Sequence, residues 1–246
     1  MSWEAARCAL DPEAVRAALG DAGVAVIEGT DVSDAEFVAF LERLGPLTFT
    51  EGEASHPGQP KLNVVSNMGR KTKPRSVFHT DTSYVSRPPA FTALKAERIP
   101  EAGGETVFTN QFDALERLDA ETQARLKGAR VLHRVTGVNP GDGAETETWH
   151  PLLRRHPVSG RVALWLSTPE RCVDLELADG SRVPQMVAEL YAHSTDPAHH
   201  WRHRWKAGDI VIWDNRCTLH KADHSAVVGD RVLHRGMVGG EEPVAA

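Results

Sequence analysis

Near its start the chain alternates between a helical and an extended pattern of apolar positions. Asp11 precedes Pro12, an arrangement typical of an N-cap followed by proline at the first position of a helix. Gly20 or Gly23 can end that helix, because glycine is favoured just past a helix C-terminus. Residues 24–27 are all apolar and predict a short buried strand. The chain therefore begins with a helix followed by a strand.

A second helix is predicted directly after this strand. Ser33 and Glu36 have the spacing of a capping box, and Gly45 can end the helix. Its apolar stripe consists of Phe37, Phe40, Leu41 and Leu44. Residues 46–76 then predict mostly loop around a strand at 62–65, and they end in a basic stretch.

The rest of the chain predicts short strands separated by turn residues. The strands are expected at 90–96, 106–109, 130–136, 161–167, 209–213 and 231–238. Helices are expected at 112–126, in one or two pieces, and at 183–193, and the Gly- and acid-rich residues 139–150 predict a loop that could act as a lid. Spaced strands with few helices favour a sandwich or barrel over a parallel α/β sheet. Without internal repeats or linkers, residues 1–246 are expected to form one domain.

Composition and charge narrow the function classes. The 246 residues are 41% hydrophobic and 25% charged, which is ordinary for a globular protein. A formal net charge of −6 argues against non-specific nucleic-acid binding, which needs a basic surface. We therefore expect no nucleic-acid partner.

The cysteines and the N-terminus indicate where the protein works. The 3 cysteines are widely spaced and fit free thiols in a reducing compartment. The N-terminus has neither the basic segment nor the apolar run of a signal peptide, and no stretch approaches the length of a membrane span. We expect a cytoplasmic protein with no membrane partner.

A candidate metal site involves two distant parts of the chain. His79 and Asp81 lie two residues apart, so on an extended segment both side chains can reach one ion. His220 follows the apolar run 210–213 and can add a second imidazole. Two histidines and a carboxylate can form the facial triad of non-haem Fe(II) oxygenases, which leaves open coordination positions. Alternatively, since the chain has 12 histidines, His79 is a polar residue near a turn and Asp81 an Asx-turn former.

Two arginines downstream suggest an anionic co-substrate. Arg231 and Arg235 face the same side if residues 231–238 form a strand. Two guanidinium groups on one face of an apolar strand need anionic partners. The alternative is a pair of surface salt bridges, which is the commoner arrangement of arginines.

Several motifs, in order along nearly the whole chain, carry a resemblance to a known family. They lie at 23–27, 40–47, 78–81, 87–89, 103–106, 213–216 with His220, and 231–235. With them the chain resembles the taurine dioxygenase/2,4-D dioxygenase (TauD/TfdA) family of Fe(II)- and 2-oxoglutarate-dependent oxygenases. The resemblance implies a mainly β fold with flanking helices, the double-stranded β-helix or jelly-roll shared with cupins. It also implies a homo-oligomer, because members often form dimers or tetramers.

The resemblance further assigns roles to particular residues. It implies that His79, Asp81 and His220 bind iron. Thr106 would contact a carboxylate of 2-oxoglutarate. Arg231 would form an ion pair with the distal carboxylate of the same molecule. Arg235 would lie near the metal-bound end of the co-substrate and the substrate. The implied reaction uses O2 to oxidise, most often to hydroxylate, a small organic molecule and releases succinate and CO2. Since halogenating relatives lack the carboxylate, Asp81 favours hydroxylation or a related oxidation.

Residue 75 argues against taurine itself as the substrate and makes another anionic molecule the candidate. Sulfonate-oxidising members have an asparagine four residues before the first ligand, where this chain has Arg75. Arg75, near Lys71 and Lys73, can bind an anionic group such as a carboxylate. The alternative is a solvated basic loop, which is the usual state of a run of charges.

Two other function classes remain open on the sequence alone. One is a non-oxidative cupin-type metal enzyme, such as an isomerase or hydrolase, and the other is a non-catalytic metal-binding relative. Neither needs Thr106, Arg231 and Arg235 as a carboxylate-binding set, so their convergence beside the metal would argue against both.

Overall fold

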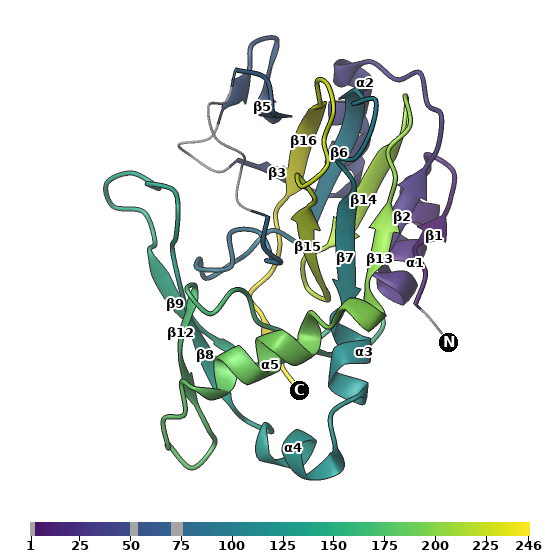
Figure 1. Cartoon of the computed structure of the whole chain (residues 1–246). Coiled ribbons are helices and arrows are strands. Elements are labelled where there is room, and N and C mark those ends of the chain that lie inside the picture. The colour runs from purple at the N-terminus through teal and green to yellow at the C-terminus, as the bar shows by residue number, and fades with distance from the viewer. Residues whose placement is uncertain (1–2, 50–53, 70–75) are drawn as a thin grey trace.

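The computed structural model describes residues 3–49, 54–69 and 76–246, and within them the main sheet has eight strands. The order is β1-β2-β14-β6-β16-β5-β4, and β3 pairs with β16 (Figure 1). The strands are β1 (Ala6–Arg7), β2 (Val24–Ile27), β3 (Leu47–Thr48), β4 (Ser55–His56), β5 (Gln59–Ser66), β6 (Phe91–Arg98), β14 (Ile210–Asp214) and β16 (Val232–Val238). Apart from β1 with β2, neighbouring strands run antiparallel.

A smaller antiparallel sheet faces this one. It consists of β7 (Thr106–Asn110) between β13 (Trp201–His203) and β15 (Thr218–Ala222). Apolar side chains from both sheets pack together: Val211 and Leu233 of the main sheet share one core with Phe108 of β7. Two facing sheets make the β sandwich that the spaced strands predict.

Two helices cover the outer face of the main sheet. They are α1 (Pro12–Ala22) and α2 (Asp34–Leu44), and their apolar faces pack on Ala25 and Ile27 of β2. Val24 and Val26 instead face the core between the sheets, as the alternation of a strand requires. Each helix begins and ends where the sequence predicts, with side-chain caps at Asp11 and Ser33 and glycine caps at Gly23 and Gly45.

The remaining elements form a second layer beside the smaller sheet. One sheet, at the lower left of Figure 1, contains β8 (Arg130–Arg134), β9 (Glu147–Pro151) and β12 (Cys172–Glu176). Another contains β10 (Leu153–Arg155), β11 (Val162–Leu164) and β17 (Val244–Ala245). The helices here are α3 (Gln111–Glu116), α4 (Ala120–Arg125), α5 (Met186–Ser194) and the 3-10 turn η1 (Pro197–His199). Leucines of these elements share one apolar core.

Some elements differ from the sequence prediction. The helix expected at 112–126, in one or two pieces, is present as two helices, α3 and α4, separated by residues 117–119. Residues 221–223 follow an apolar run and predict a turn, but this prediction is wrong, because Lys221 and Ala222 continue β15 in its pairing with β7. The loop expected at 139–150 ends earlier, since Glu147 already pairs with β8. No helix in the described part of the chain is long and apolar enough to cross a membrane.

Candidate metal and co-substrate site

The structure brings His79 and His220 together through their backbones. His79 N–H donates to the His220 carbonyl at 3.0 Å, and His220 N–H donates to the His79 carbonyl at 2.9 Å. The two imidazole centroids are consequently 4.4 Å apart. Because β15 is held by β7, the position of His220 is fixed by the smaller sheet, and His79 extends that sheet by one bridge.

Asp81 completes the cluster. Its Oδ1 lies 3.5 Å from His79 Nε2 and 3.8 Å from His220 Nε2. The three donor atoms lie within 4.8 Å of one another, so they can bind one ion. Asp81 and His220 are buried, and His79 is half-buried. The predicted juxtaposition of these three residues is therefore present in the fold.

Hydrogen bonds and burial give the ligand atoms the form that a metal needs. His79 Nδ1 lies 3.0 Å from the Val77 carbonyl, which makes Nδ1 the protonated nitrogen and leaves a lone pair on Nε2. Burial lowers the pKa of His220 to about 3, so this imidazole is neutral at physiological pH. Although burial opposes its ionisation, the facing histidines and a hydrogen bond from Thr92 hold the pKa of Asp81 well below its usual range. Two neutral imidazoles and one carboxylate fit Fe(II).

Arg231 points its side chain toward this cluster. It is 2% exposed, which contradicts the surface salt-bridge alternative. Its Nε donates to the Gly104 carbonyl at 2.8 Å, and its Nη2 donates to Thr106 Oγ1 at 3.4 Å. Gly104 has a φ of +75°, and an added Cβ would lie 2.9 Å from Arg231 Cδ. Gly104 therefore makes room for the Arg231 side chain.

Arg235 lies four residues after Arg231, and both side chains line the same cavity. It donates to Asn63 Oδ1 at 3.1 Å, across the β16–β5 pairing that sets these residues opposite each other. Burial lowers the pKa of Arg231 and of Arg235 to about 10 each, so both remain charged near neutral pH. Both arginines thus keep a positive charge in a region that burial makes unfavourable for it.

The two histidines and the two arginines line one cavity of about 170 Å³. It is lined by Val65, His79, Leu94, Thr106, Trp213, His220, Ala222, Arg231 and Arg235. Among the described residues no carboxylate forms a salt bridge with Arg231. Its guanidinium group donates to the Gly104 backbone carbonyl and to the Thr106 hydroxyl, and both of these acceptors are neutral. The cavity can therefore hold a small anion next to the metal-binding atoms.

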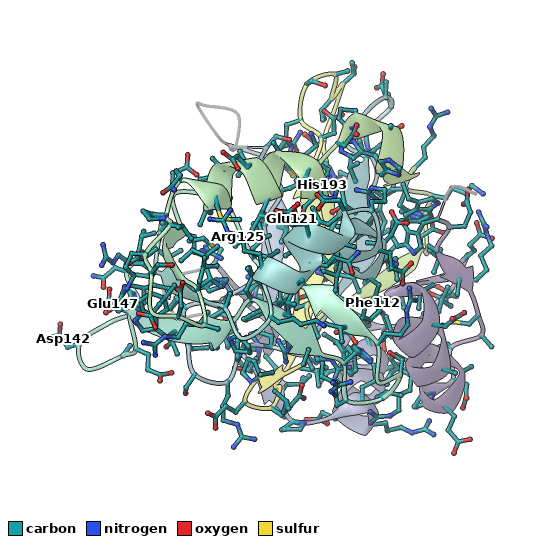
Figure 2. The ribbon with its side chains drawn as sticks, turned by 90° about the horizontal axis from the view of Figure 1, so that it is seen from below. Phe112, Glu121, Arg125, Asp142, Glu147 and His193 are labelled. Atoms are coloured by element: carbon teal, nitrogen blue, oxygen red, sulfur yellow. The ribbon has the colours of Figure 1, made fainter. Side chains whose placement is uncertain are left out.

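A larger hollow of about 410 Å³ is bounded by the loop that follows Asp81. Its lining includes Thr82, which follows Asp81, and Met237, whose backbone is paired with Thr92. The outer wall is the loop before β9, whose Asp142 lies at the outer tip in Figure 2. Unlike the smaller cavity, this hollow is lined mainly by loops.

Arg75, with Lys71 and Lys73, lies outside the described residues. His200 Nε2 lies 2.9 Å from the Thr195 carbonyl, and His203 Nε2 lies 3.1 Å from Asp209. These histidines are therefore engaged with separate neighbours.

Sequence reasoning missed a second group of potential metal ligands, Asp34, His56 and His234. Lys95 Nζ lies 3.1 Å from Asp34 Oδ1 and 2.9 Å from Glu97. The ammonium group already supplies positive charge beside the Asp34 carboxylate, which disfavours a dication there. Nothing short-range in the sequence indicates this group, because its members come from α2, β4 and β16.

Comparisons with known proteins agree with this geometry. Residues 2–237 match the family described as taurine catabolism dioxygenase TauD, TfdA family. Pentalenolactone F synthase of Streptomyces arenae is 34% identical over 240 residues, which cover 85% of this chain and 79% of that protein. The alpha-ketoglutarate-dependent 2,4-dichlorophenoxyacetate dioxygenase of Cupriavidus pinatubonensis is 28% identical, with 88% and 84% covered.

Solved structures are similar over most of their length. A taurine dioxygenase from Burkholderia xenovorans superposes with a TM-score of 0.80 at 31% identity, covering 97% of this chain and 85% of that one. The structure of AAD-2 in complex with Mn(II) and N-oxalylglycine gives a TM-score of 0.78 at 27% identity, covering 96% and 92%. These matches extend across both facing sheets.

Proposed function

The chain belongs to the taurine catabolism dioxygenase TauD, TfdA family, and we propose that His79, Asp81 and His220 hold its iron. It is a 2-oxoglutarate-dependent non-haem iron dioxygenase with a double-stranded β-helix fold, which confirms the class and fold predicted from the sequence. Fe(II), 2-oxoglutarate and O2 are its cofactor and co-substrates. The named relatives are oxygenases, which favours oxidation over the cupin-type and non-catalytic alternatives.

The observation that carries the ligand assignment is the convergence of three donor atoms within 4.8 Å. His79 presents the nitrogen that its Val77 hydrogen bond leaves unprotonated, and burial keeps His220 neutral. When bound, iron together with 2-oxoglutarate supplies the oxidising chemistry that consumes O2 and releases succinate and CO2. The residues of the chain position the reactants and exclude water from the cavity.

Arg231 and Thr106 bind the distal carboxylate of 2-oxoglutarate, and Arg235 lies toward the end nearer the metal. Support comes from the cavity that contains all three side chains together with both histidines. The Arg231 guanidinium is held by neutral acceptors, so a carboxylate would bring the missing negative charge and a charge-assisted hydrogen bond. Thr106 then offers its hydroxyl to the same carboxylate.

The substrate is a small, anionic organic molecule, and Arg75 contacts its charged group. The hollow of about 410 Å³ beside Asp81 has room for such a molecule. One relative is named for acting on 2,4-dichlorophenoxyacetate, which carries a carboxylate. Residues 1–246 act as one domain, in the cytoplasm, as a homo-oligomer, and without a nucleic-acid partner.

Anaerobic titration of Fe(II) and 2-oxoglutarate into the apo-protein tests the assignment. The visible charge-transfer band of the chelate should form in the wild-type protein and disappear in His79→Ala. Iron binding without the band would mean that the arginines serve another ligand, and the non-oxidative cupin alternative would replace this proposal.

Arg75→Ala tests the substrate assignment separately. In a screen of small organic acids, the variant should need more substrate for half-maximal succinate release while its 2-oxoglutarate requirement stays unchanged. Unaltered substrate dependence would return Arg75 to a solvated basic loop.

A further inference from the structure

The two carboxylate oxygens of Asp81 face different neighbours. Oδ1 lies 3.5 Å from His79 Nε2 and 3.8 Å from His220 Nε2, on the side of the proposed metal. Oδ2 points away and accepts a hydrogen bond from Thr92 Oγ1 at 2.7 Å. Since Oδ2 is engaged elsewhere, one oxygen alone is presented to the cluster.

A chain of hydrogen bonds continues behind Thr92. Asn215 Nδ2 donates to Thr92 Oγ1 at 2.9 Å, and Trp213 Nε1 donates to Asn215 Oδ1 at 3.1 Å. Thr92 and Asn215 are 0% exposed, and Trp213 is 1% exposed. These side chains therefore depend on one another rather than on bulk water for their hydrogen bonds.

The groups at its two ends fix which atom donates and which accepts at every step of this chain of hydrogen bonds. An indole N–H can only donate, so the Asn215 amide must turn its oxygen to Trp213 and its NH2 to Thr92. The hydroxyl of Thr92 has a single proton, which it donates to Asp81, and an ionised carboxylate can only accept. One orientation of all the groups satisfies every bond, which holds Oδ2 in place.

Asn215 also anchors the backbone beside Asp81. Its carbonyl accepts from Thr80 Oγ1 at 3.0 Å and from Trp165 Nε1 at 2.8 Å. Thr80 lies between the two ligands of the first segment, and Asn215 precedes His220 in the turn before β15. Asn215 consequently connects the segment that carries His79 and Asp81 to the segment that carries His220.

We propose that Thr92 and Asn215 are positioning residues that restrict Asp81 to binding the iron through Oδ1 alone, an inference that rests on the proposed metal site. The reason this matters is coordination number. A facial triad keeps all of its open positions only while the carboxylate occupies a single one. A second Asp81 oxygen on the metal would take a position that the co-substrate or O2 requires.

Thr92→Val tests the inference, because valine keeps the shape of the side chain and removes the hydroxyl. The probe is Mn(II), titrated into the apo-protein under argon and followed by the loss of its free-ion EPR signal. Loss of an outer hydrogen-bond partner typically lowers metal affinity about 10- to 100-fold, and we expect a decrease in that range. Thr92→Ser keeps the hydroxyl and should restore the affinity to within about threefold of wild type.

Thr109→Val is the matched control. Thr109 is a buried threonine of β7 whose hydroxyl accepts from Gln111 Nε2, outside the Asp81 chain. It should lose stability as Thr92→Val does, by a hydroxyl-to-methyl change at a buried site, yet keep wild-type affinity for Mn(II). Co(II) absorption gives a second readout: Thr92→Val should change the ligand-field bands, and Thr109→Val should not.

The outcomes separate this inference from the metal assignment. Wild-type affinity and an unchanged Co(II) spectrum in Thr92→Val would overturn the role of Thr92 and leave the metal site standing. Equal losses in Thr92→Val and Thr92→Ser would also overturn it, because packing rather than the hydroxyl would then be responsible. A wild-type protein that binds no Mn(II) would overturn both.

If Thr92→Val does not fold, Trp213→Phe provides a second test. This substitution removes the donor at the far end of the chain of hydrogen bonds and should still weaken Mn(II) binding. An unchanged Mn(II) affinity in Trp213→Phe would count against the inference.

Discussion

The two cavities beside Asp81 are built in different ways. The smaller one is lined largely by side chains of paired strands, including His220 on β15 and Arg235 on β16. The larger one is lined mainly by the loop after Asp81 and the loop before β9. Strands fixed by register carry the residues proposed to bind the metal and 2-oxoglutarate, whereas loops can change without disturbing them. One scaffold can therefore serve different substrates.

Removing a proposed metal ligand from the smaller cavity should have the largest effect. His220→Ala should abolish Mn(II) binding and reduce succinate release by more than the ~100-fold upper limit expected for an outer partner. Its backbone pairing with His79 and β7 remains, so the fold should persist, as far-ultraviolet circular dichroism can verify. Retained metal binding would show that His220 is not a ligand.

Removing a charge from the smaller cavity should have the next largest effect. Arg231→Ala should raise the KM for 2-oxoglutarate about 10- to 100-fold, since hydrogen bonds to charged groups contribute about 1.5–3 kcal/mol. Arg231→Lys keeps the charge without the planar fork and should fall between wild type and alanine. The KM for substrate, measured at saturating 2-oxoglutarate, should change little in either variant. An unchanged 2-oxoglutarate requirement would remove Arg231 from the co-substrate site.

The same contrast explains what the sequence could and could not predict. His79, Asp81 and Arg231 belong to short motifs whose residue types limit the chemistry, and these lie where the prediction needs them. Thr92 escaped notice because its role depends on β14 pairing with β6, which sets Trp213 opposite it. Asn63 escaped for the same reason, since β5 pairing with β16 sets it opposite Arg235.

Acid should weaken the supports of both cavities. Burial lowers the pKa of His220 to about 3 and of His150 to about 4, and it lowers the pKa of His133 well below its usual range. His150 Nε2 lies 3.0 Å from the carbonyl of Val85, which lines the larger hollow. Unfolded histidines have a pKa of about 6.5, so below that pH the unfolded chain binds more protons. Stability of the apo-protein should therefore fall as pH decreases from about 6.5 toward 4.

Thermal unfolding of the apo-protein at several pH values measures this dependence. The Tm should decrease steadily between about pH 6.5 and 4, where unfolded histidines gain protons that the buried ones do not. His150→Gln removes one of the titrating groups and should make the decrease shallower, even if it lowers the Tm at neutral pH. Parallel curves for wild type and variant would show that His150 does not contribute to the pH dependence.

The smallest effect should come from the loop wall of the larger hollow. Glu145 Oε2 accepts from Ser86 N–H at 2.9 Å and so joins the two loops that line the hollow. Glu145→Ala should raise the KM for substrate about 2- to 10-fold, as expected for one hydrogen bond of about 0.5–1.5 kcal/mol. The 2-oxoglutarate KM should not change, because the smaller cavity lies on strands that this contact does not reach.

Asp142→Ala is the matched control for that loop. It removes the same charge from the outer tip, so it separates a lost charge from a lost contact between loops (Figure 2). If both variants raise the substrate KM equally, electrostatics at the entrance is responsible rather than the Ser86 contact. If Glu145→Ala instead changes the 2-oxoglutarate KM, the two cavities are coupled, and the separation between strand-built chemistry and loop-built specificity does not hold.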